Sequence, residues 1–170
     1  MERRLHRLFL LRHAEASRGK PGGSDFDRPL TDRGRQDAAA LGQRMRTLAL
    51  RPSHVLCSSA VRTRETWEAA MKELGAPFPE TSLMAELYRG DASDYRILIA
   101  TSGVEQALLV VGHNPMIQEL TLALTRGNGA ATAISAGFPA GGLAVLDFEE
   151  PLWRIAPRTG SLAAFLSPHR

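Results

Sequence analysis

Residues 107–115 read Ala-Leu-Leu-Val-Val-Gly-His-Asn-Pro. A short, wholly apolar run that ends in a glycine-containing turn is typical of a strand buried on both faces of a parallel sheet. Proline is favourable at the first helical position, so Pro115 predicts the start of a helix. Ile117, Leu120 and Leu124 then fall on one face of that helix. The stretch predicts a strand, a turn that carries His113, and a helix.

The same alternation of apolar runs and helical patterns extends toward the amino terminus. Residues 8–11 and 54–57 predict two more short strands. A loop rich in glycine and proline follows the first strand, and Thr31 is suited to cap the next helix. Ser58 and Ser59 are expected to cap a second helix that reaches Leu74. Strand–helix alternation favours right-handed crossovers and a parallel sheet.

Weaker patterns complete the predicted fold. Residues 82–84 favour a strand, the chain is irregular as far as Asp91, and a helix is expected over about 94–101. Residues 141–148 and 152–156 are interpreted as an antiparallel terminal hairpin, with 162–166 as a short tail segment. We therefore predict a single α/β domain over residues 1–170. Its expected architecture has three layers, α/β/α, with a mostly parallel sheet and an antiparallel C-terminal hairpin.

Composition excludes several classes of protein. The chain has 170 residues, of which 44% are hydrophobic and 23% charged, and this is a globular composition. The net charge is only +3 without a basic run, which argues against a nucleic-acid partner. No apolar run approaches the roughly 18 residues of a membrane span, and the stretch after the basic start is too short for a signal peptide. Cys57 is the single cysteine. We expect a cytoplasmic protein without disulfides.

Polar and charged side chains follow three of the predicted strands. Ligands of open α/β sheets bind where strands end, and there the sequence places Arg12 and His13, then Ser58, Ser59 and Arg62, then His113 and Asn114. Each alone has an ordinary explanation, because a histidine in a loop or an arginine on a helix is usually a solvated side chain. Arg62 and Arg64 are about 200° apart around a helix, so both cannot face one site. Two arginines and two histidines can nevertheless meet at one sheet edge.

Four motifs occur in order: Leu-Arg-His-Ala-Glu at 11–15, Pro-Leu-Thr-Asp-Arg-Gly at 29–34, Ser-Ser-Ala-Val-Arg-Thr-Arg-Glu-Thr at 58–66, and Val-Gly-His-Asn-Pro at 111–115. Over roughly residues 8–148 the chain resembles the histidine phosphatase superfamily, the phosphoglycerate-mutase-like proteins. Its short length, without the extra insertions of the mutases, is similar to the SixA-type phosphohistidine phosphatase branch. The resemblance implies a phosphoglycerate-mutase-like fold.

The resemblance also implies roles for individual residues. His13 would accept the phosphoryl group, Arg12 and Arg62 would bind its oxygens, and His113 would complete the pocket. We also assign Asn114 to substrate binding. Relatives often use a carboxylic acid to protonate the leaving group, and the best match by position is Glu86, which is equally well an ordinary loop carboxylate. Arg64 departs from the motif and is interpreted as a surface residue or an outer support, and Thr31 as a structural cap.

The chemistry of these side chains agrees with that assignment. Phosphoryl transfer needs positioning and charge neutralisation, which forked guanidinium groups supply. A neutral imidazole is a competent nucleophile near pH 7, and nearby arginines should lower its pKa. A hydrogen bond from Nδ1 of His13, for example to a backbone carbonyl, would leave Nε2 to attack. Nothing in this scheme needs a metal or another cofactor.

Several functions remain open from the sequence. The favoured one is a metal-independent phosphatase that acts through phosphorylated His13, with phosphohistidine in proteins as substrate. The alternatives are a broad phosphomonoesterase acting on small phosphate esters and a non-catalytic phosphate-binding module. A metal hydrolase built on His13 and His113 is disfavoured, since few carboxylates accompany them. The partner would be a phosphorylated protein or a small phosphate ester. We expect a monomer, with specificity set by the loops at 17–28 and 87–94.

Overall fold

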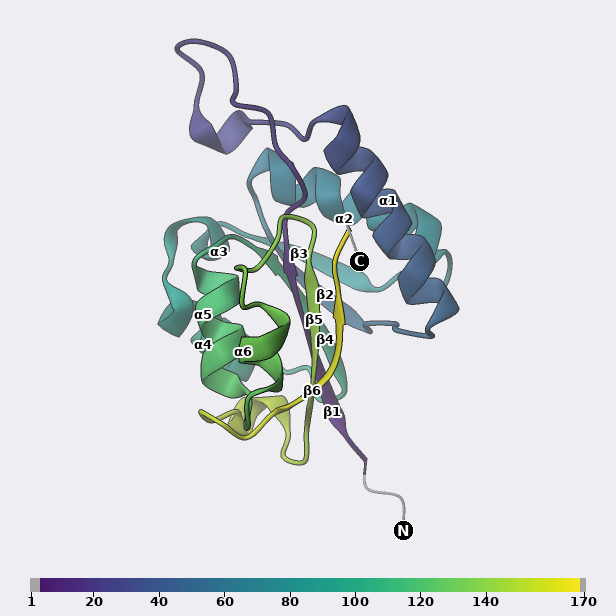
Figure 1. Cartoon of the computed structure of the whole chain (residues 1–170), viewed down its shortest axis with the longest axis vertical. Helices are drawn as coiled ribbons and strands as arrows, with labels where there is room; N and C mark the ends of the chain where they lie inside the picture. Colours follow the sequence, from purple (N-terminus) through teal and green to yellow (C-terminus); the bar gives the residue numbers. More distant parts are fainter. Residues whose placement is uncertain (1–3, 169–170) are drawn as a thin grey trace.

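One mixed sheet organises the protein, for which the computed structural model describes residues 4–168 (Figure 1). Within that range the sheet has six strands in the order β3-β2-β4-β1-β5-β6. The strands β1 to β4 are parallel to one another, whereas β5 is antiparallel to β1 and β6 antiparallel to β5. Their bounds are β1 His6–Arg12, β2 His54–Ser58, β3 Glu80–Met84, β4 Ala107–Gly112, β5 Leu143–Phe148 and β6 Ser161–Leu166.

Helices cover both faces of this sheet. Figure 1 shows α1 and α2 on one side and α3 to α6 on the other. The first pair comprises α1 (Asp32–Thr47) and α2 (Val61–Leu74), and the second group α3 (Glu86–Arg89), α4 (Ala92–Thr101), α5 (Met116–Leu124) and α6 (Gly129–Ala133). This arrangement confirms the predicted three-layer α/β/α fold, including its mostly parallel sheet and its antiparallel C-terminal part.

Alternating residues of β1 build the two halves of the core. Phe9 is buried with Met45 of α1 and Trp67 of α2, whereas Leu10 is buried with Tyr95 of α4 and the residues of α5. Side chains of a strand point alternately to opposite faces, so a wholly apolar strand needs cover on both sides. The continuous apolar run in the sequence is therefore the direct consequence of a central, doubly covered strand.

The predicted terminal hairpin is correct in its first strand and wrong in its second. Residues 152–156 do not form a strand, because Leu152–Arg154 is a 3₁₀ helix, η2, and β6 is the partner of β5. Pro151 and Pro157 bracket the segment and have no N–H to donate to a sheet. Leu152 is fully buried in the core that α4 and α5 cover. Its apolar character came from this packing and not from sheet pairing.

Smaller differences concern the ends of helices. The segment expected to be irregular contains α3, and α4 begins at Ala92 after an Asp91 capping box. The short helix α6, which follows Asn128, was not predicted from the sequence. Ala60 and not a serine precedes α2 as its N-cap, without a side-chain hydrogen bond. The predicted Ser58 cap is wrong because that hydroxyl bonds to a histidine, as described below.

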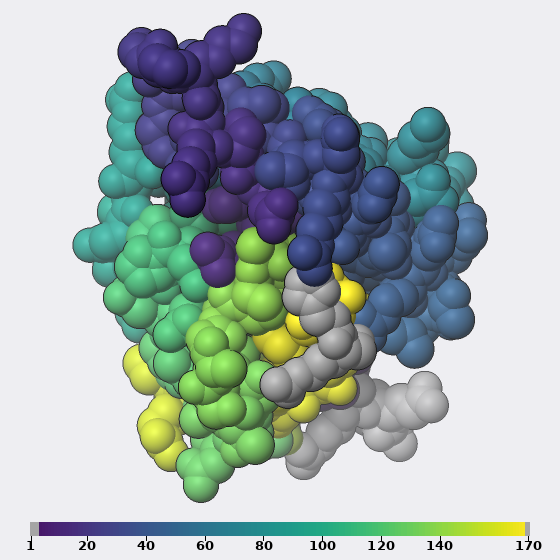
Figure 2. Space-filling model, turned by 45° about the horizontal axis from the view of Figure 1, so that its top comes forward, coloured from purple at the N-terminus to yellow at the C-terminus, as the bar shows by residue number. Residues whose placement is uncertain are grey.

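A long loop connects β1 to α1 and rises above the rest of the molecule (Figures 1 and 2). It contains the 3₁₀ helix η1 (Asp25–Asp27) and ends at Thr31, whose hydroxyl accepts a hydrogen bond from the Gly34 N–H, as predicted for a cap. A Cβ at Gly34 would lie 2.1 Å from the carbonyl oxygen of Glu15, so the absence of a side chain lets α1 approach the loop closely. No helix in residues 4–168 has the length and apolar character needed to cross a bilayer.

Candidate active site

The carboxyl ends of β1 and β4 bring the two histidines together. Arg12 is in register with Gly112, and His13 donates its backbone N–H to the Gly112 carbonyl over 3.1 Å. His13 and His113 therefore follow paired positions of adjacent strands. Their ring centroids are 5.4 Å apart, with an interplanar angle of 57°. The parallel register thus creates the proximity that the sequence predicted.

Backbone contacts fix the orientation of the His13 ring. Its Nδ1 is 2.7 Å from the carbonyl oxygen of Ala14, which can only accept a hydrogen bond. The Ala14 N–H in turn donates to the Thr66 hydroxyl over 2.9 Å, in a fully buried position. The proton of a neutral His13 therefore resides on Nδ1, and the lone pair resides on Nε2. This is the hydrogen bond expected from the sequence.

The environment keeps His13 neutral. Burial lowers its pKa to about 4, with smaller lowering contributions from the positive charges of Arg62, Arg12 and Arg28, while the hydrogen bond to Ala14 acts in the opposite direction. Burial disfavours the charged imidazolium, and nearby cations add repulsion. At neutral pH the ring therefore carries a nucleophilic nitrogen that is not protonated. The arginines contribute as predicted, although desolvation is the larger cause.

His113 is held from the side of β2. Its Nε2 lies 2.7 Å from the Ser58 hydroxyl, and its backbone N–H donates to the Tyr95 hydroxyl over 3.2 Å. Burial lowers the His113 pKa to about 3, and electrostatic interactions with His13 and Arg62 add to the effect. Its Nδ1 is buried and has no hydrogen-bond partner among residues 4–168. A neutral His113 can therefore offer an N–H to a bound oxygen.

Two guanidinium groups flank the histidines. Arg12 donates from Nη1 to the Phe138 carbonyl over 2.7 Å, and burial lowers its pKa below the usual value. Arg62, in the first turn of α2, is only 7% exposed and lies beside the ring of Tyr88, 5.9 Å from its centroid. Within the described chain, the Nε atoms of both arginines are buried without a partner. Arg64, two residues along α2, is partly buried and lies on another side of the helix.

The carboxylate of Asp25, which was not predicted from the sequence as a site residue, lies against Arg62. Asp25 of η1 accepts from Arg62 through its backbone oxygen at 2.8 Å and through Oδ2 at 3.2 Å. Its carboxylate also accepts from Nη1 of Arg28 and from the Tyr88 hydroxyl, each over 2.9 Å. The hydrogen bond from Arg28 is the largest cause that lowers the Asp25 pKa to about 2, followed by those from Tyr88 and Arg62. This carboxylate is ionised at neutral pH.

Three residues, Asp25, Phe26 and Tyr88, form what we call the rim of the site. Tyr88 and Phe26 complete this rim over the histidines. The Tyr88 ring is 5.7 Å from the His113 ring and 5.1 Å from the Phe26 ring, both edge-on. Two of these residues belong to the loop at 17–28 and the third to the loop at 87–94, the two segments predicted to set specificity. Position in those loops was the available signal, since no motif marks the individual side chains.

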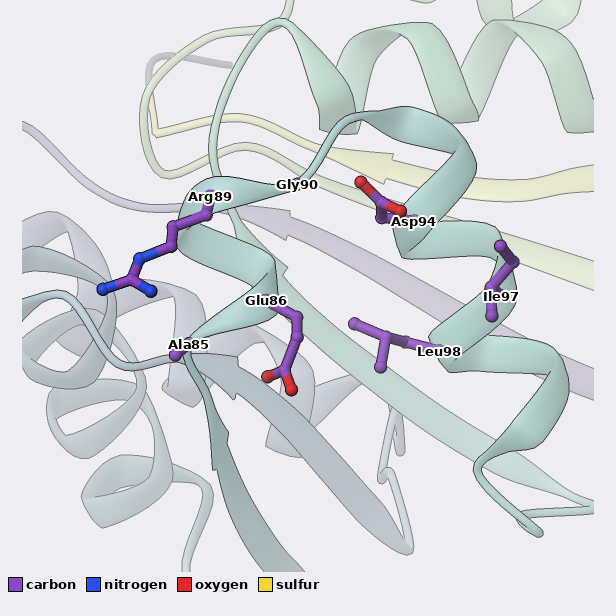
Figure 3. A pocket seen from close by; sticks show the side chains of 7 residues that line it. All are labelled: Ala85, Glu86, Arg89, Gly90, Asp94, Ile97 and Leu98. Atoms are coloured by element: carbon purple, nitrogen blue, oxygen red, sulfur yellow. The ribbon is translucent and has the colours of Figure 1, made fainter.

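Glu86 lies apart from this cluster. It is exposed and lines a separate cavity of about 470 Å³ with Asp94 and Leu98 of α4. Figure 3 shows the side chains of Glu86 and Leu98 bordering the same space between α3 and α4. Glu86 and Tyr88 are two residues apart in α3 and so point in different directions. Since Tyr88 faces His113, the structure does not bring the Glu86 carboxyl to the histidines.

Asn114 lies on the other flank, beyond Arg12. Its Nδ2 donates to the Phe138 carbonyl over 3.2 Å, the same oxygen that Arg12 contacts. Both residues line a cavity of about 460 Å³ together with Gln118 and Phe165. Asn114 therefore supports the arginine and opens onto a space next to it. No group of three or more His, Cys, Asp or Glu side chains in residues 4–168 is placed to hold a metal ion.

Comparison with known proteins agrees with this geometry. Residues 8–98 match the family model of the histidine phosphatase superfamily, branch 1. An uncharacterized protein of Mycobacterium leprae is 35% identical over 165 residues, which is 93% of this chain and 99% of that protein. The chain belongs to the histidine phosphatase superfamily, and the order of its four motifs is explained by this membership.

Solved structures show the same fold. A crystal structure described as the "putative phosphohistidine phosphatase SixA from Agrobacterium tumefaciens" superposes with a TM-score of 0.84 at 32% identity, covering 96% of this chain and 98% of that one. A structure described as the protein histidine phosphatase SixA complexed with tungstate has a TM-score of 0.77 at 23% identity, over 96% and 97% of the two chains. These likenesses confirm the predicted phosphoglycerate-mutase-like fold and the resemblance to the SixA-type branch.

Proposed function

We propose that this protein is a metal-independent phosphatase that removes the phosphoryl group from phosphohistidine in proteins, through transient phosphorylation of His13. The observation that carries the proposal is the donation from Nδ1 of His13 to the Ala14 carbonyl. It leaves the Nε2 lone pair beside His113 and in the field of Arg12 and Arg62. A binding module would need only the cations, whereas a fixed, neutral imidazole suits a nucleophile.

The proposed reaction has two displacements at phosphorus. In the first, Nε2 of His13 forms a bond to phosphorus while the bond from phosphorus to the substrate imidazole breaks. A substrate ring already protonated on its other nitrogen departs as neutral imidazole. In the second, a water oxygen displaces Nε2, and both protons of the water remain on the phosphate that is released. Arg12, Arg62 and an N–H of His113 would neutralise the equatorial oxygens in both steps.

The carboxylates near the site favour phosphohistidine over phosphate esters. An alkoxide leaving group needs a proton, and an ionised carboxylate cannot supply one. Asp25 has a pKa of about 2, and Glu86 lines a different cavity. An imidazole leaving group needs no proton from the enzyme. The ionised state of Asp25 and the separate location of Glu86 therefore support phosphohistidine as the substrate.

A phosphoserine or phosphothreonine protein is the second candidate. It is favoured by a partial match to the mitochondrial serine/threonine-protein phosphatase PGAM5 of Xenopus tropicalis, 37% identical over 67 residues, or 39% of this chain and 23% of that protein. Small phosphate esters remain the broader version of the same alternative. For either, His13 would keep its role, and the proton for the leaving group would have to come from solvent or from a group other than Glu86.

The cellular setting is part of the proposal. We place the reaction in the cytoplasm and on a monomer, with a phosphorylated protein as partner. The histidines and arginines of the site all come from one chain, so the proposed chemistry requires no second subunit. No nucleic acid or membrane takes part in it.

A rapid-quench experiment tests the proposal. A histidine-phosphorylated protein labelled with ³²P is mixed with wild type, His13→Ala, and the control His54→Ala, whose ring pairs with Glu80 in a surface position. Wild type and control should form a labelled protein that is stable in alkali and labile in acid, and then release phosphate. His13→Ala should form none and lose at least about 1,000-fold in turnover. Full turnover by His13→Ala would refute the proposal.

A further inference from the structure

A fixed negative charge stands at the opening of the site. The Asp25 carboxylate accepts hydrogen bonds from Arg28 in its own loop, from Arg62 of α2 and from Tyr88 of α3. Its side chain is nevertheless 54% exposed, whereas that of Arg62 is 8% exposed. Asp25 thus contacts the buried Arg62 through Oδ2 and the partly exposed Arg28 through Oδ1, and its carboxylate remains open to solvent.

Tyr88 connects this charge to the histidines, because its hydroxyl donates to Asp25 and its ring lies edge-on to that of His113. His13 emerges from the central strand β1 and approaches phosphorus from the sheet. In-line displacement puts the leaving group opposite the nucleophile, toward solvent and the rim. The Asp25 charge also reaches His113, whose pKa it raises against the other influences. The negative charge of Asp25 is therefore felt within the histidine cluster, beside which the phosphoryl group would be bound.

We propose that Asp25 selects substrates by the charge of their leaving group: it disfavours groups that carry a second anion and favours neutral or cationic ones. This inference rests on the proposed function, because it concerns which phosphoryl compounds reach His13. A carboxylate or phosphate on the leaving group would be repelled by Asp25, and a cationic side chain near the phosphorylated residue would be attracted. Phosphometabolites with a second acidic group are thus poor substrates, and basic protein surfaces are good ones.

Selection by charge differs from two simpler roles of Asp25 in its effect on different substrates. A carboxylate that merely competed with phosphate for Arg62 would weaken all substrates equally. One that merely oriented Arg62 would help all substrates equally, and its backbone oxygen already performs part of that task at 2.8 Å. Only a charge at the leaving-group side changes the ranking of substrates.

The ranking can be measured with three phenyl phosphates that carry a carboxylate, a carboxamide or an aminomethyl group at the para position. Dividing each variant's kcat/KM by the wild-type value for the same compound cancels the intrinsic reactivity of the ester. The test variant is Asp25→Asn, which keeps shape and one acceptor oxygen. The control is Asp27→Asn, an exposed carboxylate of the same 3₁₀ helix that lines a separate cavity with Lys20 and Pro29.

For Asp25→Asn we expect the normalised kcat/KM to rise about fivefold for the carboxylate relative to the carboxamide, and to fall for the aminomethyl compound. The contrast should shrink in 0.5 M salt, and Asp27→Asn should leave the ranking unchanged. An equal change for all three compounds, or the same shift in the control, would overturn the inference. Wild-type turnover without a labelled His13 would instead refute the proposed function, so the two failures are distinguishable.

Discussion

The hydroxyl of Ser58 lies 2.7 Å from Nε2 of His113, and both side chains are buried. The same oxygen accepts a longer hydrogen bond, of 3.4 Å, from the Ala60 N–H. A hydroxyl can accept from one group and donate to another, and we predict that the Ser58 proton is directed to Nε2. The proton of neutral His113 is then on Nδ1. A serine at the end of β2 thereby sets the tautomer of a histidine at the end of β4.

Loss of this hydroxyl should impair His113 without removing it. We expect Ser58→Ala to lower kcat about tenfold. Without the hydroxyl, Nε2 of His113 has no hydrogen-bond partner, and the ring can carry its proton on either nitrogen, so that Nδ1–H is present in only part of the molecules. The ¹⁵N chemical shifts of His113 report the tautomer directly, and Ser59→Ala is the control. An unchanged tautomer pattern together with wild-type kcat would contradict this role.

Arg62 should require a guanidinium and not only a positive charge. Arg62→Lys keeps the charge but loses the fork that binds two oxygens, so we expect kcat/KM to fall about 100-fold. Arg64→Lys, in the same helix but on another side, should stay within twofold of wild type. Steady-state kinetics with tungstate inhibition measures both effects. Equal losses in the two variants would mean that the helix and not the site was disturbed.

The Thr66 hydroxyl should contribute both to the free energy of unfolding and to the position of His13. It accepts from the Ala14 N–H over 2.9 Å and donates to the Arg62 carbonyl over 2.7 Å. Thr66→Val leaves that buried N–H unpaired, at a cost of about 2 kcal/mol in the free energy of unfolding. Thr66→Ser retains the oxygen and should retain most of the stability and the activity. Urea titration and kcat distinguish the two variants, and similar losses in both would point to packing alone.

The depressed pKa of His13 predicts how stability depends on pH. The folded pKa of about 4 is below the unfolded value of about 6.5, so the unfolded state binds more protons between these values. Stability due to His13 is therefore complete above the unfolded pKa and decreases as pH falls toward 4. From pH 7 to 5 this residue alone should account for about 2 kcal/mol.

Urea titrations of wild type and His13→Asn at pH 7 and pH 5 measure this contribution. The decrease between the two values should be smaller in the variant by about 2 kcal/mol. His113, with a folded pKa of about 3, contributes in the same direction in both proteins. An identical decrease would mean that His13 titrates normally in the folded state.

Glu86 should be dispensable for a phosphohistidine substrate. Its carboxyl lines the cavity beside α4 and not the histidine cluster. We expect Glu86→Gln to stay within twofold of wild type on a phosphohistidine protein. The same variant assayed on alkyl phosphates provides the comparison. A large loss on the alkyl phosphates alone would show that Glu86 does act as an acid for esters.

Strands were predicted correctly from the sequence where an apolar run had a single structural explanation. Residues 8–11 and 107–111 are apolar because both faces of their strands are covered, and both were predicted as strands. Residues 152–156 were misinterpreted because an apolar 3₁₀ turn packed into the core has the same composition as a short strand. Hydrophobicity reports burial, and it does not distinguish sheet pairing from packing when the segment is this short.

The site residues at the ends of strands were predicted from the sequence, whereas those in loops were not. Arg12, His13 and His113 follow directly from strands whose register fixes their positions. Asp25 and Tyr88 reach Arg62 only because a long loop and a short helix fold over it. Contacts between loops depend on conformations that no local pattern encodes, so only the two loops and not their residues were predictable.

The central place of β1 in the sheet predicts different hydrogen-exchange rates for the strand that precedes His13 and for the loop that contains Asp25. Amide hydrogens in β1, bonded to β4 and β5 on its two sides, should be among the last to exchange with deuterium. Those of the long loop around Asp25 should be among the first. The proposed nucleophile thus follows a strand that is paired on both sides, whereas the residue proposed to select substrates lies in a loop. Descendants of such a chain can acquire new substrates through loop substitutions without loss of the phosphoryl-transfer machinery.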